Sequence, residues 1–251
     1  MTFQGKVVCV TGGAQGLGAA IAEQFAEQGA HVSVADRDVA ATVDSEQRRH
    51  FGCDVTSESD VERWVGQTLD NYGKIDVLIN CAGTLSRAPV HEITSAEWDR
   101  VFAVNVRGTF LPTRSVLQVM LKQPPGGVII NIASQAGVRV EPLMAHYSAS
   151  KAAIIQFTKS VALEYAPHVR CNTVSPGLVE TTLVQRSLGE YARTAGISYA
   201  EAVEQRKATI PMKRFQTAHN LADGVLFLAS ERASEITGVN LDVTGGELIP
   251  R

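Results

Sequence analysis

Seven short apolar runs alternate with helical patterns along the whole chain, and this alternation limits the fold more than any other feature. The runs are mostly apolar on both faces, as expected of parallel strands that helices cover on both sides. They are Val7–Thr11, His31–Ala35, His50–Cys53, Val77–Asn80, Val128–Ala133, Arg170–Ser175 and Gly238–Val243. Repeated strand–helix units predict an α/β fold in which two helical layers enclose a seven-stranded, doubly wound parallel sheet.

Helix boundaries can be predicted from capping residues. The first helix is expected to stop at Gly29, because glycine adopts the left-handed conformation that ends many helices. Ser59 is expected to cap a helix that ends at Gly73. Thr94 followed by Glu97 predicts a capping box that opens a long helical region.

Three segments are expected to depart from regular elements. Gly108 and Pro112 should interrupt the helical region that follows Thr94. The segment Asp38–Arg49 is short, so its helix should have one or two turns. Residues 183–210 are helical in parts, for example Glu201–Lys207, but their apolar periodicity is weak. This segment is predicted to be a lid or substrate loop.

Length fits one domain of this kind. The 251 residues can bury a sizeable core, and no linker or repeat divides them, so residues 1–251 are expected to form a single domain. A (β/α)₈ barrel has a similar length and is the alternative fold that the motifs must exclude.

Charge and cysteine usage exclude several classes of partner. A formal net charge of −3 leaves no basic footprint for nucleic acid. No apolar stretch of about 18 residues exists, so no membrane-spanning helix is expected. Cys9, Cys53, Cys81 and Cys171 are widely spaced, with no CxxC pair. They predict buried free thiols of a cytoplasmic protein, without a disulfide framework or a metal site.

A glycine-rich turn, Thr11–Gly18, follows the first predicted strand and opens the first helix. Glycine permits positive φ and lets the backbone approach a ligand closely, and a helix N-terminus attracts a pyrophosphate. This strand–turn–helix context predicts a dinucleotide site and argues against the barrel. The turn residues assigned to the site are Gly12, Gln15, Gly16, Leu17 and Gly18.

An acidic residue ends the second predicted strand, at the distance from the glycine turn that such sites require. Asp36 can accept hydrogen bonds from both hydroxyls of an adenosine ribose, and its carboxylate repels a 2′-phosphate. The cofactor is therefore predicted to be NAD. NADP stays open, because Arg37 could partly offset the repulsion.

A tyrosine and a lysine four residues apart indicate a proton-transfer site. Tyr147 and Lys151 share one face of a predicted helix. A phenol is a poor base at neutral pH, and a nearby cation lowers its pKa. An alcohol–ketone couple needs this kind of proton donor and acceptor.

Further polar residues follow strand ends in the same order along the chain. Asn80–Gly83 ends the fourth strand, Ser134 the fifth and Asn172–Gly177 the sixth, while Asn105 lies within a helix. Together with the glycine turn and the Tyr147–Lys151 pair, they resemble the short-chain dehydrogenase/reductase family over the whole chain. The resemblance implies a Rossmann-like fold with strand order 3-2-1-4-5-6-7. It also implies a homotetramer packed through the long helices after the fourth and fifth strands.

The resemblance implies catalytic roles for four residues. Tyr147 would be the general acid/base, and Ser134 would hydrogen-bond the substrate oxygen. Lys151 would bind the nicotinamide ribose and lower the pKa of Tyr147. Asn105 would hold a water that links Lys151 to solvent. Further cofactor contacts implied by the resemblance are Asp54, Val55, Asn80, Ala82, Gly83, Pro176, Gly177, Val179 and Thr181.

The substrate is less defined than the reaction. Walls of the pocket are expected from Leu85–Val90, Gln135–His146 and Leu183–Ile210. Candidate substrate residues are Gln135, Arg139, Glu141, Met144 and Leu183, although Arg139 and Glu141 could instead pair with each other or a partner subunit. His146 points away from the Tyr147 face and is expected to be structural.

Three functions remain open at this stage. The leading hypothesis is an NAD-dependent oxidoreductase acting on a secondary alcohol, such as a polyol, sugar or cyclic alcohol. The second is an NADPH-dependent 3-oxoacyl-type ketoreductase, which Asp36 argues against. The third is a non-catalytic nucleotide-binding regulator, which the intact set of four catalytic candidates argues against.

Overall fold

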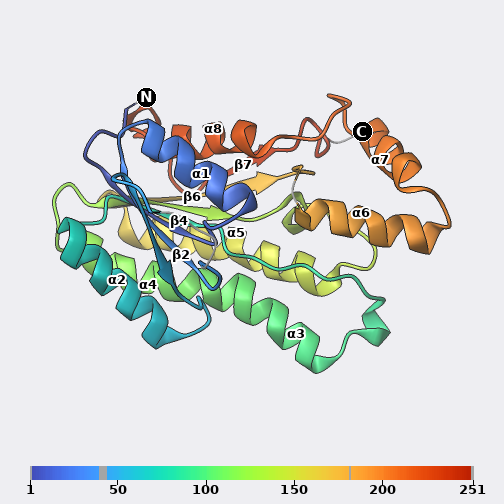
Figure 1. Ribbon diagram of the computed structural model, residues 1–251, viewed down its shortest axis with the longest axis horizontal. Helices are drawn as coiled ribbons and strands as arrows, with labels where there is room; N and C mark the ends of the chain where they lie inside the picture. The colour runs from blue at the N-terminus through green and yellow to red at the C-terminus, as the bar shows by residue number, and fades with distance from the viewer. Residues whose placement is uncertain (1, 40–43, 181, 250–251) are drawn as a thin grey trace.

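A seven-stranded parallel sheet forms the centre of the protein (Figure 1). The computed structural model describes residues 2–39, 44–180 and 182–249. The strands are β1 (Val7–Thr11), β2 (His31–Asp36), β3 (Arg48–Gly52), β4 (Val77–Asn80), β5 (Gly127–Ile132), β6 (Val169–Pro176) and β7 (Asn240–Val243). Their order is β3-β2-β1-β4-β5-β6-β7, and every neighbouring pair is parallel. The predicted fold class and strand order are confirmed.

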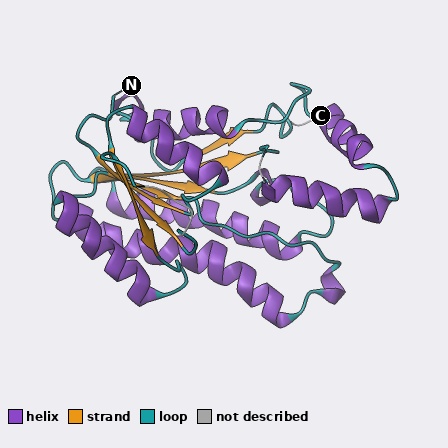
Figure 2. Ribbon diagram, viewed as in Figure 1, coloured by secondary structure: helices purple, strands orange, loops and turns teal. Residues whose placement is uncertain are grey.

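Helices cover both faces of the sheet, which makes three layers (Figure 2). α1 (Gly16–Glu27) and α8 (Ala218–Ala229) lie on one face, and α2 (Glu58–Tyr72), α4 (Gly108–Met120) and α5 (Ala145–Tyr165) lie on the other. Alternate side chains of β1 enter separate cores: Val8 and Val10 pack with α1 and α8, and Cys9 packs with α2. Burial on both faces explains why the strands are apolar without alternation.

The two edge strands differ most from their predicted bounds. β3 starts at Arg48, two residues before the predicted start, and two arginines open it. It is only half-buried at the sheet edge, so apolar patterning does not mark its beginning. β7 starts at Asn240 instead of Gly238, whose φ of +75° takes it out of the extended conformation.

Helix ends are predicted better than helix starts. Gly29 and Gly73 have φ of +87° and +74° and end α1 and α2, as predicted. The N-cap of α2 is Ser57, however, and not Ser59: the Ser57 side chain accepts a hydrogen bond from the Asp60 amide. Ser59 stands inside the helix, where its hydroxyl contacts that of Ser57.

The predicted capping box at Thr94 is half formed. Thr94 caps α3 (Ser95–Phe102) by accepting from the Glu97 amide, but the Glu97 carboxylate binds Arg100 instead of the Thr94 amide. A reciprocal capping box occurs at Ser198 and Glu201, at the start of α7 (Tyr199–Thr209). The motif is the same at both places, and a competing arginine decides which box closes.

A π-helical turn, η2 (Ala103–Arg107), separates α3 from α4 and contains Asn105. The predicted interruption occurs directly before Gly108, the first residue of α4, whereas Pro112 lies inside α4 and does not break it. Gly108 permits close packing, since an added Cβ would stand 2.6 Å from a methyl of Val55. The remaining short turns are η1 (Val90–Glu92), η3 (Gln135–Gly137) and η4 (Glu231–Ala233).

The segment predicted to be a lid or substrate loop forms two helices, α6 (Thr182–Ala195) and α7. They extend beyond the carboxyl ends of the strands (Figure 1). Leu188, Ile210 and Phe215 form a small core there, separate from the two main ones. Only one side chain of α7 is buried, Ala202, which accounts for the weak apolar periodicity of this segment.

The segment between β2 and β3 differs from its predicted short helix as far as it is described. Asp38, Val39 and residues 44–47 are not helical, and residues 40–43 lie outside the described residues.

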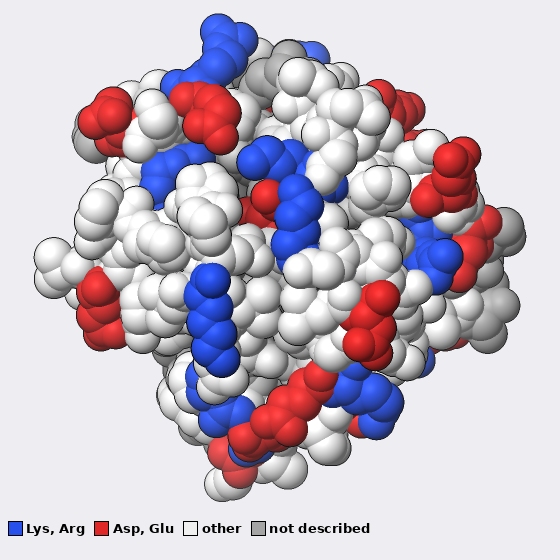
Figure 3. Space-filling model, turned by 90° about the vertical axis from the view of Figure 1, so that its left-hand side faces the viewer, with Lys and Arg blue, Asp and Glu red and all other residues white. Residues whose placement is uncertain are grey.

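Charges of both signs are interspersed on the face seen in Figure 3. At the amino ends of β1 and β4, for example, Asp76 lies 3.5 Å from the ammonium of Lys6 and 2.9 Å from that of Lys74. Among the described helices, none is long and apolar enough to cross a membrane.

Candidate active site

The glycine turn brings the backbone after β1 against the segment after β4. Gly12 and Gly16 have φ of +66° and +57°, in the left-handed region that favours glycine. A Cβ added at Gly12 would stand 2.7 Å from the Cα of Ala82. A Cβ added at Gly18 would stand 2.1 Å from the backbone oxygen of Gly12. Gln15 is the exposed N-cap of α1, whose first turn includes Leu17. Only glycines permit this turn, and it fits a pyrophosphate held against a helix N-terminus.

Thr11, which the sequence analysis did not assign to the site, holds these two segments together. Its buried hydroxyl accepts hydrogen bonds from the amides of Cys81 (3.1 Å) and Ala82 (3.2 Å). The signal in the sequence was a polar residue at the end of an apolar strand, because a polar group in the interior needs a hydrogen-bond partner.

Asp36 ends β2 next to the glycine turn and is half-buried. One carboxylate oxygen accepts from the Ala14 amide (3.1 Å) and the other from the Asp38 amide (3.3 Å). These two contacts show that Asp36 also caps the local backbone. A carboxylate has about four lone-pair sites, so acceptor capacity remains for a ribose. The Arg37 side chain beside it is exposed.

Asp54 and Val55 are largely committed to local structure. The Asp54 carboxylate accepts from the amide (2.9 Å) and hydroxyl (2.8 Å) of Thr56, and the Asp54 amide donates to Asp60. Val55 is buried against Gly108. These contacts position the loop that follows β3.

Asn80 is a structural residue as far as its side chain is concerned. It is buried, and its amide nitrogen donates to Thr113 (2.9 Å) and Asn131 (2.8 Å) inside the sheet. Asn131 in turn donates to Thr158 (2.8 Å). The Asn80 side chain therefore does not line the ribose site as the resemblance implied, and this polar chain joins β4 and β5 to the helices behind them.

Tyr147 and Ser134 lie together, although thirteen residues separate them. Tyr147 stands in the first turn of α5, and Ser134 follows β5 and caps η3 by accepting from the Ala136 amide (3.1 Å). Burial raises the pKa of Tyr147, and the hydrogen bond with Ser134 lowers it. Burial is the larger of the two effects, so the pKa of Tyr147 lies above the ordinary value of a tyrosine.

Lys151 is a buried cation on the same helix. Its ammonium donates to the carbonyl of Ile132 (3.0 Å) and lies 5.8 Å from the centre of the Tyr147 ring. Burial lowers the pKa of Lys151 to about 8. The same burial raises the pKa of the neighbouring Cys81 thiol to about 12, which keeps it protonated.

Asn105 is fully buried in η2, and its side chain holds three segments together. Its oxygen accepts from the Thr84 amide (2.8 Å), and its nitrogen donates to the Thr84 carbonyl (3.0 Å) and the Ser150 hydroxyl (2.9 Å). Its oxygen and the Lys151 ammonium both lie 3.5 Å from the point where a Cβ of Gly83 would stand. The four catalytic candidates are therefore gathered at one place.

The segment after β6 closes the opposite side of the site. An added Cβ at Gly177, next to Pro176, would stand 2.8 Å from the Gln216 side-chain oxygen and 3.2 Å from that of Gln135. These oxygens are buried and have no hydrogen-bond partner among the described residues, so acceptor capacity remains beside Gly177. Val179 is buried and bridges to Gln216. Thr181 and the side chain of Leu183 lie outside the described residues.

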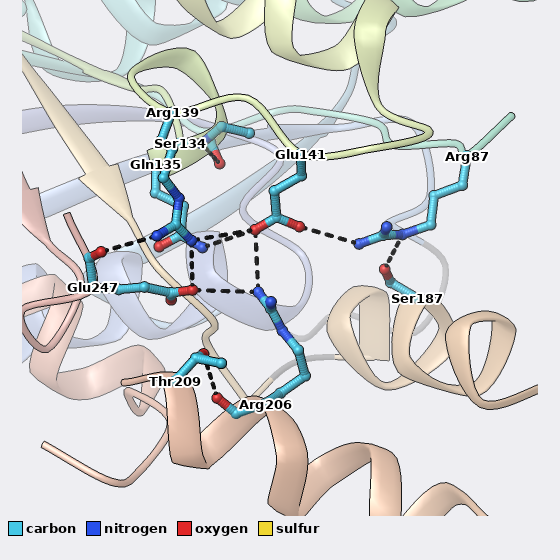
Figure 4. Close-up of polar contacts among 10 residues, drawn as sticks. Arg87, Ser134, Gln135, Arg139, Glu141, Ser187, Arg206, Thr209 and Glu247 are labelled. Atoms are coloured by element: carbon cyan, nitrogen blue, oxygen red, sulfur yellow. Dashed lines mark hydrogen bonds and ion pairs between the residues drawn. The ribbon is translucent and has the colours of Figure 1, made fainter. Parts of the chain in front are cut away.

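The candidate substrate wall belongs to a network of charges (Figure 4). Glu141 lies between Arg87 on one side and Arg139 and Arg206 on the other. Arg139 and Glu141 are 4.0 Å apart, but the closer partner of Arg139 is Glu247, at 2.9 Å. Met144 and Gln135 are buried at this wall.

Arg87 and Arg206 lie within the predicted wall segments but were not singled out, and Glu247 lies outside those segments. No local pattern marks the three residues, because their partners lie 41 to 108 residues away in the chain. His146 is structural, as predicted: its ring is buried, and one nitrogen lies 2.6 Å from the Ser86 hydroxyl. In the part of the chain that the structure describes, no group of three His, Cys, Asp or Glu residues could hold a metal ion. All four cysteines are free.

A nucleotide-binding turn at the switch of strand order, with a Ser–Tyr–Lys cluster beside it, defines a dinucleotide-dependent α/β oxidoreductase. Residues 12–247 match a family model described as enoyl-(acyl carrier protein) reductase. The chain belongs to the short-chain dehydrogenase/reductase family. It is accordingly an oxidoreductase that acts on secondary alcohols or ketones with a nicotinamide cofactor.

Relatives of known name align over nearly the whole chain. A sorbitol dehydrogenase of Cereibacter sphaeroides is 36% identical over 98% of both chains. A 2-(R)-hydroxypropyl-CoM dehydrogenase of Xanthobacter autotrophicus is 39% identical over 96% of this chain and 97% of that protein. The structure of an NAD⁺-bound xylitol dehydrogenase superimposes with a TM-score of 0.92 at 34% identity and covers 98% of this chain and 100% of that one.

Replacement of Gly18 by alanine should weaken cofactor binding at least tenfold, because the new Cβ would stand 2.1 Å from the Gly12 oxygen and displace the turn. Titration of NADH fluorescence measures the effect. Gly66→Ala is the matched control: Gly66 lies in α2 with nothing within 4 Å of an added Cβ, so affinity should not change. Equal affinity of the Gly18 variant would show that the turn does not bind the cofactor.

Replacement of Lys151 by methionine should raise stability at pH 7 by up to about 3 kcal/mol, because it removes a buried cation. Burial lowers the pKa of Lys151 from 10.5 to about 8, so between these values the unfolded chain binds more protons than the folded protein. The loss of stability that the buried Lys151 cation causes in the unmodified protein is therefore complete below pH 8, and it declines as the pH rises above 8. Urea unfolding at pH 7 and pH 9.5 should show the advantage of the variant shrinking, whereas exposed Lys159→Met should show none. A variant less stable than the unmodified protein at pH 7 would contradict this reasoning.

Proposed function

We propose that this protein oxidises a secondary alcohol of a polyol, a sugar or a cyclic alcohol with NAD⁺. The observation that carries the proposal is the hydrogen-bonded pair of Ser134 and Tyr147 beside the buried ammonium of Lys151. Two hydroxyl groups that meet at one point can bind one substrate oxygen and exchange its proton. The names of the sorbitol and xylitol dehydrogenases support a polyhydric alcohol as the substrate.

Tyr147 acts as the general base in this direction of the reaction. Tyr147 first loses its own proton toward Lys151 and solvent, and its phenolate oxygen then takes the proton of the substrate hydroxyl. Ser134 donates a hydrogen bond to the same substrate oxygen and holds it in place. The chemistry that a bound nicotinamide would supply is the uptake of the hydride from the substrate carbon. In the reverse direction the protonated Tyr147 returns the proton to the ketone oxygen.

Lys151 and Asn105 serve the proton transfer from behind Tyr147. Lys151 holds a positive charge close to the phenol and favours its ionised form once the site is filled. Asn105 orders the backbone at Thr84. In the proposed proton route it would hold a water between Lys151 and solvent. Its place in a π-helical turn suits this role, because such turns expose backbone groups that a regular helix would use.

The residues of the glycine turn and Asp36 would hold the adenosine half of the cofactor, together with the backbone of Ala82 and Gly83. Gly177, Val179 and Thr181 would hold the nicotinamide half. Asp36 favours NAD because its charge opposes a 2′-phosphate at the same place.

We also propose that residues 1–251 form one domain and that the protein is a cytoplasmic homotetramer. Exposed apolar side chains on α4 and α5 support the assembly: Phe110 is 40% exposed and Leu163 is 86% exposed. The free, buried thiols of Cys9 and Cys171 support a reducing compartment.

Tyr147→Phe should lower kcat for alcohol oxidation about 10²- to 10⁴-fold, because it removes the general base and keeps the ring. NADH binding should be nearly unchanged. The formation of NADH from polyols and cyclic alcohols is followed by absorbance, and Tyr165→Phe, on the same helix, is the control. Full turnover by the Tyr147 variant would contradict the mechanism.

Asp36→Asn should reduce the preference for NAD over NADP at least tenfold, because it removes the repelling charge but keeps an acceptor for the Ala14 amide. The double variant with Arg37→Ala should lose part of the gain in NADP use. The ratio of kcat/KM for the two cofactors measures the preference. An unchanged ratio would refute the ribose role, and a native preference for NADP would favour the 3-oxoacyl ketoreductase.

A further inference from the structure

Five charged residues form one network at the substrate wall (Figure 4). Three are arginines from different parts of the chain: Arg87 follows β4, Arg139 follows η3 and Arg206 lies on α7. Glu141 and Glu247 join them. Glu247 is the internal member: its side chain is 1% exposed, and it contacts Arg139 at 2.9 Å and Arg206 at 3.4 Å.

The two oxygens of Glu141 are used differently. Oε1 accepts a hydrogen bond from Arg206 at 3.1 Å and another from the side-chain amide of Gln135 at 3.4 Å. Oε2 lies 3.7 Å from the nearest nitrogen of Arg87, which is longer than a hydrogen bond. One oxygen therefore anchors the carboxylate, and the other faces a guanidinium across a gap.

Arg87 is fixed from the lid side of this gap. Its Nε donates to the hydroxyl of Ser187 on α6 at 2.8 Å, so its terminal nitrogens point toward Glu141. The side chains of Arg87 and Glu141 are 20% and 16% exposed, so both are held in place while a small molecule can still reach them.

The gap adjoins the proposed reaction centre. Glu141 contacts Gln135, the neighbour of Ser134, and Ser134 contacts Tyr147. The charges of Glu141 and Arg87 also act on Tyr147, where the first raises and the second lowers its pKa. The gap lies on the side of the reaction centre that Gln135 lines, so a hydroxyl on the carbon next to the reacting one would face it.

We propose that Glu141 and Arg87 form a subsite for this neighbouring hydroxyl, which makes the protein select vicinal polyols over alcohols with one hydroxyl. The hydroxyl would donate to Glu141 Oε2 and accept from an Arg87 nitrogen. An oxygen can stand at hydrogen-bond distance from two atoms that are 3.7 Å apart, and both bonds are charge-assisted. This inference rests on the proposed function.

The pair favours a neutral hydroxyl over an anionic group. A carboxylate or sulfonate that approached Arg87 would also approach Glu141, and like charges repel. The network holds three guanidiniums and two carboxylates, so one positive charge is in excess. Arg139 bonds to both the carbonyl and the carboxylate of Glu247, and its side chain is 47% exposed, so solvent screens its charge. A hydroxyl satisfies donor and acceptor together, whereas an anion satisfies only one of them.

The test compares two probes that differ by one vicinal hydroxyl, 2,3-butanediol and 2-butanol, with NAD⁺. In the unmodified protein kcat/KM should be higher for the diol. Glu141→Gln and Arg87→Met should each lower kcat/KM for the diol about tenfold and for 2-butanol less than twofold, because only the diol uses the subsite. The ratio of the two values is the decisive measurement.

Two further variants distinguish direct binding of the second hydroxyl from a general effect of the network on the site. Glu247→Gln removes the buried carboxylate behind Arg139 and Arg206, which lies outside the gap, so it should lower both values and change their ratio much less than Glu141→Gln does. Glu204→Gln, on the exposed side of α7, should change neither value. Circular dichroism and thermal unfolding of each variant confirm that the fold is retained.

Several outcomes would overturn the inference. The inference fails if Glu141→Gln leaves the ratio of kcat/KM for the diol to that for 2-butanol unchanged. It also fails if Glu247→Gln lowers this ratio as much as Glu141→Gln does, because the pair would then not bind the second hydroxyl. A higher kcat/KM for 3-hydroxybutanoate than for the diol, lost in Arg87→Met and increased in Glu141→Gln, would assign Arg87 to an anionic substrate. If the unmodified protein oxidises none of the three probes, the proposed function fails together with this inference. Turnover with an unchanged ratio overturns the inference alone.

Discussion

The site depends on the close approach of two backbone segments at the centre of the sheet. β1 and β4 are neighbours, although β2 and β3 lie between them in the chain, so the strand order reverses at this point. Open α/β sheets bind ligands at such a reversal of strand order, and the glycine turn lies at this point. Thr11 joins the two sides through two hydrogen bonds, and Gly12 permits their contact with Ala82. The other parts of the site are placed relative to this contact.

Burial of the polar catalytic candidates lowers the stability of the fold, and their hydrogen-bond partners offset only part of this loss. Lys151 is buried with the Ile132 carbonyl as its acceptor, and Asn105 satisfies its amide with Thr84 and Ser150. A buried cation without a carboxylate partner is unfavourable by itself, and well-packed cores do not contain one without a reason. The surrounding apolar packing of α5 offsets this penalty, which is the arrangement expected of a functional residue.

The sequence predicted the elements whose signal is local and missed those that depend on distant partners. The alternation of strands and helices, the glycine turn and the helix ends at Gly29 and Gly73 follow from short patterns, whereas the strand order followed from the family resemblance. Asn80 matched a cofactor motif, but its side chain turns into the sheet because Asn131, fifty-one residues later, offers a partner. No local pattern distinguishes these two orientations. The π-helical turn at Asn105 was missed for a similar reason, since Thr84 and Ser150 hold it from outside the helix.

The charged network connects the specificity of the site to the lid. Arg206 and Ser187 lie on the lid helices, and each fixes one member of the gap: Arg206 holds Glu141, and Ser187 holds Arg87. The width of the gap is therefore set by the position of α6 and α7 relative to the wall after β5. Because two of these contacts are partly buried, moving the lid would break charge-assisted hydrogen bonds, which are about twice as strong as neutral ones. Substrate selection and lid position are thus two consequences of the same few contacts.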